Sequence, residues 1–177
     1  MKTTQKNKKT IKNICFCAIF AALCTAATLI SVPIPIGYIN LGDLMVLTAG
    51  WCLGGAFGAL AAGIGSALAD VLLGYVVYAP ATLIIKATVA VLGVLTYKAF
   101  KRIMPSKVKD FLPRIVSALV AECAMVGGYL LFEAVFMNYG FAAFASVPLN
   151  AVQALIGSLG ASLIIGKIIF WTKLNRE

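Results

Sequence analysis

The 177-residue sequence contains no histidine, and only 12% of its residues are charged. Histidine is the commonest metal ligand and the commonest general base, so its absence removes much of the chemistry that enzymes use at neutral pH. The sequence also lacks a G-x-x-x-x-G-K-[ST] phosphate loop, a nucleophile elbow, a metal-ligand cluster and a cofactor fingerprint. These absences argue against an enzyme and against an ATPase. We also expect no metal and no cofactor.

Apolar residues dominate the sequence instead. Hydrophobic residues make up 62% of the sequence, against roughly 45–50% in soluble domains. The apolar runs are continuous and rich in Ala, Leu, Ile and Gly, whereas membrane β-strands alternate apolar and polar residues over ~10 positions. We therefore predict an all-α membrane protein with residues 1–177 in a single integral membrane domain, built from helices of ~20 apolar residues each.

Six apolar segments are expected to cross the membrane. They lie at about residues 11–31, 41–53, 56–73, 79–100, 114–137 and 147–172. The basic N-terminus before the first segment resembles a secretory signal, but the rest of the chain is equally hydrophobic, which favours an uncleaved first span. The third segment carries small residues all round, so we expect it to be buried among its neighbours.

The basic residues indicate the orientation. Fourteen of the fifteen lie in the N-terminal arm, in the segment 98–114 and in the C-terminal segment 167–176, and with six spans all three fall on one side. By the positive-inside rule, both termini are predicted to be cytoplasmic. The same clusters argue against nucleic-acid binding, because they flank apolar spans and contain no recognisable binding motif.

The five cysteines suggest neither a disulfide framework nor a zinc site. Their number is odd, their spacings do not match metal-ligand motifs, and all lie within apolar runs. We interpret them as small buried hydrophobic residues.

The stretch PIPIGYINLGD, residues 33–43, interrupts the apolar pattern between the first two spans. Its prolines prevent a helix from continuing, and its glycines permit tight turns. One interpretation is an ordinary structured connector. The other is a loop folded over a binding pocket, with Tyr38, Asn40 and Asp43 available for polar contacts.

Ionisable residues inside the expected spans are expensive and normally face a cavity or a partner. By position along their helices, Asp43, Asp70, Lys86 and Glu133 share the outer third of the membrane, and Glu122 lies deeper. Two interpretations remain open: an Asp70–Lys86 ion pair that joins two helices, or a polar pocket for a small solute. The candidate binding residues are Tyr38, Asn40, Asp43, Asp70, Tyr78, Lys86, Tyr129, Glu133, Asn150 and Gln153.

A ridge of small residues lies on the first expected helix. Ala18, Ala22 and Ala26 recur every four residues, and such ridges let helices approach closely inside membranes. The ridge predicts either packing within the protein or docking onto another membrane protein.

The segments GYINLGD and GGAFGALAAGIGSALADVLLGYVVYAPATLIIK resemble the membrane-embedded S component of energy-coupling factor (ECF) transporters. The resemblance covers about residues 37–90 and is strongest to the riboflavin-type branch, which also includes proteins assigned to hydroxymethylpyrimidine and pyridoxine uptake. It implies a vitamin-binding subunit of the bacterial cell membrane that works with a transmembrane coupling protein and two cytoplasmic ATPases. It also implies a pocket under the loop 33–40, a docking ridge at Ala18, Ala22 and Ala26, and delivery by toppling of the whole subunit.

The alternative to this function is a self-contained secondary transporter or channel, in which Asp70, Lys86, Glu122 and Glu133 form an ion path. For the S component, the polar and aromatic candidates predict a compact heteroaromatic cargo bearing hydroxyl or amino groups. Hydroxymethylpyrimidine or pyridoxine is favoured, and riboflavin fits if the cavity is larger. A phosphorylated cargo fits poorly, because Lys86 is the one cation expected in the outer half.

Overall fold

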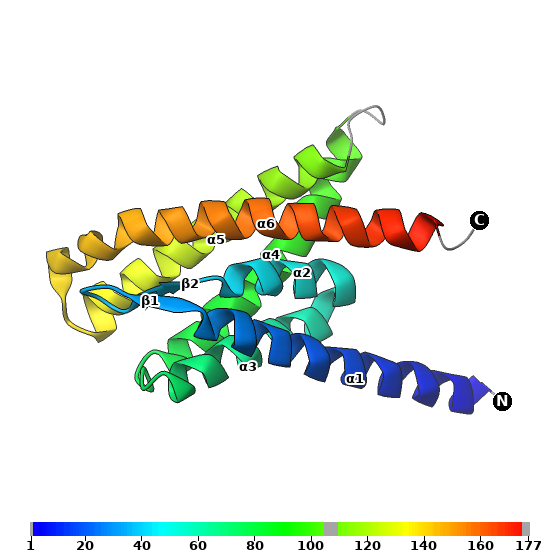
Figure 1. The fold of residues 1–177 in the computed structure, drawn as a ribbon, viewed down its shortest axis with the longest axis horizontal. Coiled ribbons are helices and arrows are strands. Elements are labelled where there is room, and N and C mark those ends of the chain that lie inside the picture. Colours follow the sequence, from blue (N-terminus) through cyan, green and yellow to red (C-terminus); the bar gives the residue numbers. More distant parts are fainter. Residues whose placement is uncertain (1, 105–109, 175–177) are drawn as a thin grey trace.

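The computed structural model describes residues 2–104 and 110–174, and helices account for most of them (Figure 1). In chain order the elements are α1 (Lys2–Leu29), β1 (Ser31–Pro33), β2 (Tyr38–Asn40), α2 (Gly42–Leu53), α3 (Gly55–Leu72), α4 (Ala79–Ile103), α5 (Phe111–Leu131), a π-helix η1 (Phe132–Phe136), a 3-10 helix η2 (Gly140–Ser146) and α6 (Val147–Leu174). The prediction of an all-α membrane protein is confirmed, apart from the short hairpin β1–β2 between the first two helices.

Five helical segments of the described chain are long and apolar enough to cross a membrane: Thr10–Leu29, Gly55–Leu72, Ala79–Ile103, Phe111–Phe136 and Gly140–Lys167. The remaining predicted span, at about residues 41–53, corresponds to α2, which has only 12 residues. At 1.5 Å per residue it is about 18 Å long, shorter than the ~30 Å hydrocarbon core of a bilayer.

The stretch that interrupts the apolar pattern forms an antiparallel hairpin. Val32 pairs with Ile39, and Pro33 pairs with Tyr38. The turn closes through a hydrogen bond from the Ile34 backbone N–H to the Gly37 carbonyl oxygen, 3.2 Å long. Gly37 has φ of +79°, a conformation that side chains other than glycine rarely adopt. The hairpin leads directly into α2, so the loop is tied to the helix that follows it.

Small residues let the helices of the core approach one another closely. A Cβ added at Gly65 of α3 would clash with the Ala21 carbonyl oxygen of α1, and one added at Gly50 of α2 would lie 2.7 Å from the Ala90 carbonyl oxygen of α4. The prediction that α3 is buried among its neighbours holds for one face only, because Leu60, Ile64 and Leu68 expose about half of their surface. The reason is geometric: the small residues gather on the inward face of the helix, and the larger residues, spaced four apart, face outward.

The cysteines follow the same division between inside and outside. Cys24 is completely buried, but Cys15, Cys52 and Cys123 are exposed on the apolar surface of the helices. The interpretation of all five as buried residues is therefore wrong. An apolar run on a membrane helix marks lipid-facing and inward-facing residues alike, since both environments are apolar.

The two ends of the molecule differ in composition. The start of α1 and the end of α6 lie at one end, whereas the hairpin and η2 lie at the other (Figure 1). The hairpin end collects the polar side chains that the sequence places in the outer third of the expected spans. It therefore positions the candidate site.

Candidate functional site

A cavity lies between the hairpin and the helices, and its free volume is about 30 Å³. Nine of the ten predicted binding residues line it: Tyr38, Asn40, Asp70, Tyr78, Lys86, Tyr129, Glu133, Asn150 and Gln153. The tenth, Asp43, is completely buried and contacts two of the lining residues. A volume of this size holds about one or two water molecules, so a larger solute requires the lining side chains to move.

Each long helix around the cavity brings its polar residues at helical spacing. Residues three or four apart lie on one face of a helix, so each helix can present two polar side chains to the cavity. The pairs are Ser66 and Asp70 on α3, Thr82 and Lys86 on α4, Tyr129 and Glu133 on α5 and η1, and Asn150 and Gln153 on α6. The hairpin strand β2 contributes Tyr38 and Asn40, and α1 contributes Thr28.

Lys86 forms an ion pair with Asp43 rather than with Asp70. The Lys86 Nζ lies 2.5 Å from Asp43 Oδ1, and both side chains are at most 2% exposed. The predicted Asp70–Lys86 pair is therefore wrong, because α2 packs against α4 and places its own carboxylate within reach of the ammonium group. The Lys86 ammonium also lies 5.4 Å from the centre of the Tyr129 ring, a distance suited to a cation–π interaction.

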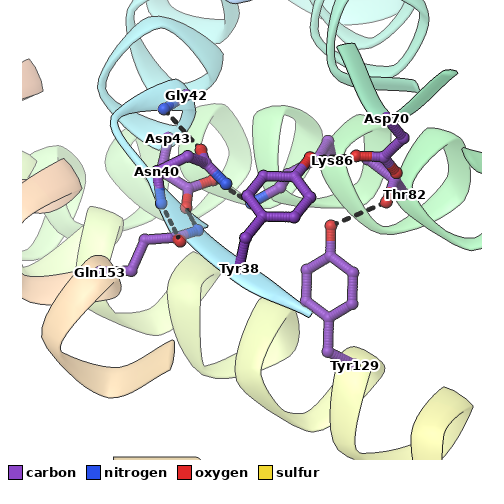
Figure 2. Close-up of polar contacts among 9 residues, drawn as sticks. All are labelled: Tyr38, Asn40, Gly42, Asp43, Asp70, Thr82, Lys86, Tyr129 and Gln153. Atoms are coloured by element: carbon purple, nitrogen blue, oxygen red, sulfur yellow. Dashed lines mark hydrogen bonds and ion pairs between the residues drawn. The ribbon is translucent and has the colours of Figure 1, made fainter. Parts of the chain in front are cut away.

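Gln153 ties three elements together around this ion pair (Figure 2). Its Nε2 donates a hydrogen bond to Asp43 Oδ2 at 2.5 Å, and its Oε1 accepts one from the Asn40 backbone N–H at 2.8 Å. Asn40 Oδ1 in turn accepts a hydrogen bond from the Gly42 N–H at the start of α2. The side chains of Asn40 and Gln153 thus hold the hairpin against α2 and α6.

Asp70 has a different set of partners. Its Oδ1 accepts a hydrogen bond from the Tyr38 hydroxyl, and Thr82 lies beside the same carboxylate and shares a 3.0 Å hydrogen bond with the Tyr129 hydroxyl. Burial and the adjacent Asp70 carboxylate raise the pKa of the Tyr38 phenol, which keeps it protonated and able to donate. The carboxylate is thereby held in one orientation.

Glu133 lies on the π-helix that ends α5. Its Oε2 accepts a 2.5 Å hydrogen bond from the Ser146 hydroxyl of η2, and its Oε1 is 3.5 Å from the Tyr78 hydroxyl. One-turn π-helices insert an extra residue and re-aim side chains, often at functional sites. Here Glu133 is 2% exposed and connects α5 to η2 and to the segment before α4.

Four lining residues retain polar groups that no described residue pairs. Thr28 Oγ1, Ser66 Oγ and Asp70 Oδ2 are buried without a hydrogen-bond partner in the described part of the chain. Asn150 also lines the cavity and makes no side-chain hydrogen bond to the residues described. The sequence analysis missed Thr28, Ser66 and Thr82, because hydroxyl residues in membrane helices commonly bond their own backbone. The signal for two of them was their position, four residues before Asp70 and four before Lys86.

Glu122 is buried beneath this layer and does not line the cavity. It is 1% exposed, and neither of its carboxylate oxygens has a hydrogen-bond partner among the described residues. Its nearest charged neighbours are Asp43 and Lys86, which act on it electrostatically. Its deeper position agrees with the sequence prediction.

The sequence model of the ECF-type riboflavin transporter S component family matches residues 8–169. The chain belongs to this family. It is therefore a multi-pass membrane protein from a family of transporter subunits, which are not enzymes. This membership favours an S component over the alternative of a self-contained secondary transporter or channel.

Among curated proteins, the S component is similar to a protein of Pyrococcus woesei described as an uncharacterized protein in a gap 3' region. The two are 42% identical over 73 residues, which is 40% of this chain and 49% of that protein. The chain thus spans about half the length of the curated relative that it matches, and the description of that relative names no cargo.

The S component also has a wider outer vestibule next to the polar cavity. The vestibule has a volume of about 330 Å³ and is lined by the hairpin turn, the α3–α4 turn and residues Met137 and Tyr139. Ile36, Gly37 and Tyr78 line both spaces, so they form the partition between them. The rings of Tyr38 and Tyr75 lie 4.8 Å apart beside this partition, and the Tyr75 hydroxyl is 3.4 Å from the Gly37 carbonyl oxygen.

The alanine ridge of the S component lies outside the core. Ala18, Ala22 and Ala26 are all exposed, whereas Ala21 and Thr25 of the same helix contact α3. Ala18 and Ala22 line an apolar groove of about 520 Å³ between α1 and the exposed ridge Leu60, Ile64 and Leu68 of α3. Packing within the protein, one of the two interpretations of this ridge, is therefore not its role in the structure.

Proposed function

We propose that this S component captures a compact heteroaromatic B vitamin or vitamin precursor, with hydroxymethylpyrimidine and pyridoxine favoured over riboflavin. The observation that carries the proposal is the cavity, where tyrosine rings surround buried carboxylates and a small free volume. Small-molecule sites are mostly apolar and hold a few placed polar groups. A flat ring with hydroxyl or amino substituents matches this combination.

The charges of the cavity argue against a phosphorylated cargo. Among the described residues, Lys86 is the one cation that lines it, and Asp43 already neutralises that ammonium group. Asp70 and Glu133 are hydrogen-bonded by neutral hydroxyl groups and not by cations. A phosphate would face two carboxylates without a free cation, which is unfavourable in a medium of low dielectric constant.

The size of the cavity argues for a small cargo. The polar cavity is separated from the vestibule by Ile36, Gly37 and Tyr78, and a cargo entering from outside has to displace this partition. The polar cavity has to widen less for a single substituted ring than for the three fused rings and polyol chain of riboflavin. Riboflavin, which the family description names, is the ligand against which the proposal is tested.

The topology that fits this function has six passes and both termini in the cytoplasm. The first turns of α1 and the last turns of α6 lie at the same end of the molecule, which supports an even number of passes with α2 as a short pass (Figure 1). In an otherwise cysteine-free protein, a cysteine at Asn138 is expected to react with an impermeant reagent in intact cells, and one at Ser106 is not. Labelling of both positions from one side would contradict this topology.

The exposed alanine ridge supports docking of α1 on a transmembrane coupling protein, which is driven by two ATPases. Ala22→Trp fills the groove that the small residues leave open and is expected to abolish co-purification of the coupling protein. Vitamin binding by the isolated S component is expected to persist, because Ala22 does not line the cavity. Loss of vitamin binding in Ala22→Trp would contradict a role confined to docking.

The decisive experiment purifies the wild-type S component and identifies its small-molecule cargo by mass spectrometry. Titration calorimetry with hydroxymethylpyrimidine, pyridoxine and riboflavin then ranks the three ligands. Binding of riboflavin alone would overturn the proposed preference for a single ring. Binding of none of the three would overturn the proposed substrate class.

A further inference from the structure

Three residues that line the cavity each bury one polar atom without a partner among the described residues. Thr28 of α1 and Ser66 and Asp70 of α3 are 2%, 0% and 1% exposed. Their atoms Thr28 Oγ1, Ser66 Oγ and Asp70 Oδ2 have no hydrogen-bond partner among the residues described. Buried polar groups are nearly always hydrogen-bonded, so three unpaired atoms facing one cavity indicate partners that come from outside the chain.

The opposite side of the cavity is already paired. Lys86 and Gln153 direct their polar atoms to Asp43, and Gln153 also accepts the Asn40 backbone N–H. Glu133 receives the Ser146 hydroxyl. A cargo that used these groups would have to break existing hydrogen bonds, whereas the wall of Thr28, Ser66 and Asp70 offers groups that lose nothing on binding.

The chemistry of this wall is dominated by an acceptor. An ionised carboxylate accepts hydrogen bonds and donates none, and Asp70 is the one charged group of the three. Tyr38 donates to Oδ1 and thereby fixes the carboxylate, whereas Oδ2 has no hydrogen-bond partner among the described residues. The hydroxyls of Ser66, one helical turn away, and of Thr28 can each donate or accept.

We propose that Thr28, Ser66 and Asp70 form the subsite that selects the cargo by its N–H donors. Asp70 Oδ2 accepts a hydrogen bond from an amino group on the ring of the cargo. The hydroxyls of Thr28 and Ser66 bind the adjacent ring nitrogen or hydroxyl group of the cargo. The substrate class is therefore an amino-substituted heteroaromatic, such as an aminopyrimidine, in preference to its oxo counterpart. This inference rests on the proposed function and sharpens it.

The test uses two ligands that differ in a single substituent. They are 4-amino-5-hydroxymethyl-2-methylpyrimidine and its 4-oxo analogue, titrated calorimetrically into the purified full-length protein. The amino compound donates its exocyclic N–H to Asp70 Oδ2, whereas the oxo compound places a carbonyl oxygen at that position and keeps its N–H on a ring nitrogen. We expect the wild type to prefer the amino compound by roughly 10–150-fold, the equivalent of one hydrogen bond to a charged group.

Asp70→Asn is the informative variant. The amide can turn its NH₂ group toward the cavity and donate to the oxo compound, so the preference is expected to fall below about threefold or to reverse. Glu122→Gln is the matched control, because it makes the same change in an equally buried residue that does not line the cavity. It is expected to keep the wild-type preference.

Three outcomes would overturn the subsite: equal binding of the two compounds by the wild type, an unchanged preference in folded Asp70→Asn, or binding of riboflavin with neither pyrimidine bound. The wild-type comparison decides even if Asp70→Asn does not fold, which its melting temperature shows. If the protein binds none of the vitamins at all, the proposed function fails as well, and this result is distinct from binding without amino selectivity.

Discussion

The two sides of the cavity contain similar residue types but treat them differently. On one side Asp43, Lys86 and Gln153 bond one another, and each uses its polar atoms within the protein. On the other side Ser66 and Asp70 keep one polar atom each without a partner among the described residues. The comparison shows that a buried polar residue of a binding protein can either stabilise the fold or bind the cargo. Whether its polar atoms are hydrogen-bonded within the protein distinguishes the two roles.

The paired side explains how a charged residue is tolerated at this depth. An isolated ammonium group in a membrane interior is costly, and a partner carboxylate with further hydrogen bonds offsets that cost. Lys86 receives this from Asp43, and Gln153 satisfies the second oxygen of Asp43. On the unpaired side, the free-energy cost of burying polar atoms without hydrogen bonds is offset only when a ligand binds.

The largest expected effect comes from breaking the paired side. Lys86→Met leaves the Asp43 carboxylate buried without its counter-ion and is expected to lower the free energy of unfolding by about 3–5 kcal/mol. The measurement is thermal unfolding of the purified protein in detergent. Asp43→Asn combined with Lys86→Met removes both charges and is expected to recover most of the loss. Wild-type stability of Lys86→Met alone would show that the ion pair is not part of the scaffold.

The next effect concerns the contact that positions the unpaired side. Gly65→Ala forces α3 away from the Ala21 carbonyl oxygen of α1, and we expect a loss of about 1–3 kcal/mol. Because the same contact sets the spacing of α1 and α3, whose residues Thr28 and Ser66 line the cavity, vitamin affinity is expected to fall as well. Gly127→Ala is the control, since nothing lies within 4 Å of its added Cβ. Equal melting temperatures for the two variants would refute the close approach.

A third comparison separates Gln153 from Asn150, both of which the sequence analysis proposed as binding residues. Gln153→Ala removes two internal hydrogen bonds and is expected to cost about 1–3 kcal/mol of stability. Asn150→Ala removes none from the described structure, and we expect it to reduce vitamin affinity roughly 2–13-fold at unchanged stability. Melting temperature and calorimetry on the same samples distinguish these results. A loss of vitamin affinity in Gln153→Ala without a loss of stability would show that Gln153 binds the cargo and does not stabilise the fold.

The smallest expected effect tests the hydroxyl groups of the unpaired side. Ser66→Ala and Thr28→Val remove atoms that have no partner among the described residues, so the stability of the ligand-free protein is expected to stay the same or to rise slightly. Vitamin affinity is expected to fall by roughly 2–13-fold. A decrease in stability without any change in affinity would place both residues in the scaffold.

Much of the architecture is determined by the sequence alone. The predicted spans agree with the observed helices to within about three residues at most boundaries inside the chain, because hydropathy and the positions of glycine and proline are local properties. The N-terminal helix is the exception, since α1 begins at Lys2, well before its apolar part. The candidate polar residues were also recognisable, because a charge within an apolar span is conspicuous wherever its helix packs.

Only the tertiary structure decided which of these residues pair. Asp43 and Asp70 were both possible partners for Lys86, and the choice followed from the way α2 packs between α4 and α6. Thr28 and Ser66 gave little signal, since a hydroxyl in a membrane helix is ordinarily satisfied by its own backbone. The exposure of the alanine ridge was equally undetermined, because small residues suit an internal contact and a docking surface alike. Hydropathy specifies that a residue lies in the membrane, but its partner depends on helix rotation and packing, which are contacts between distant segments.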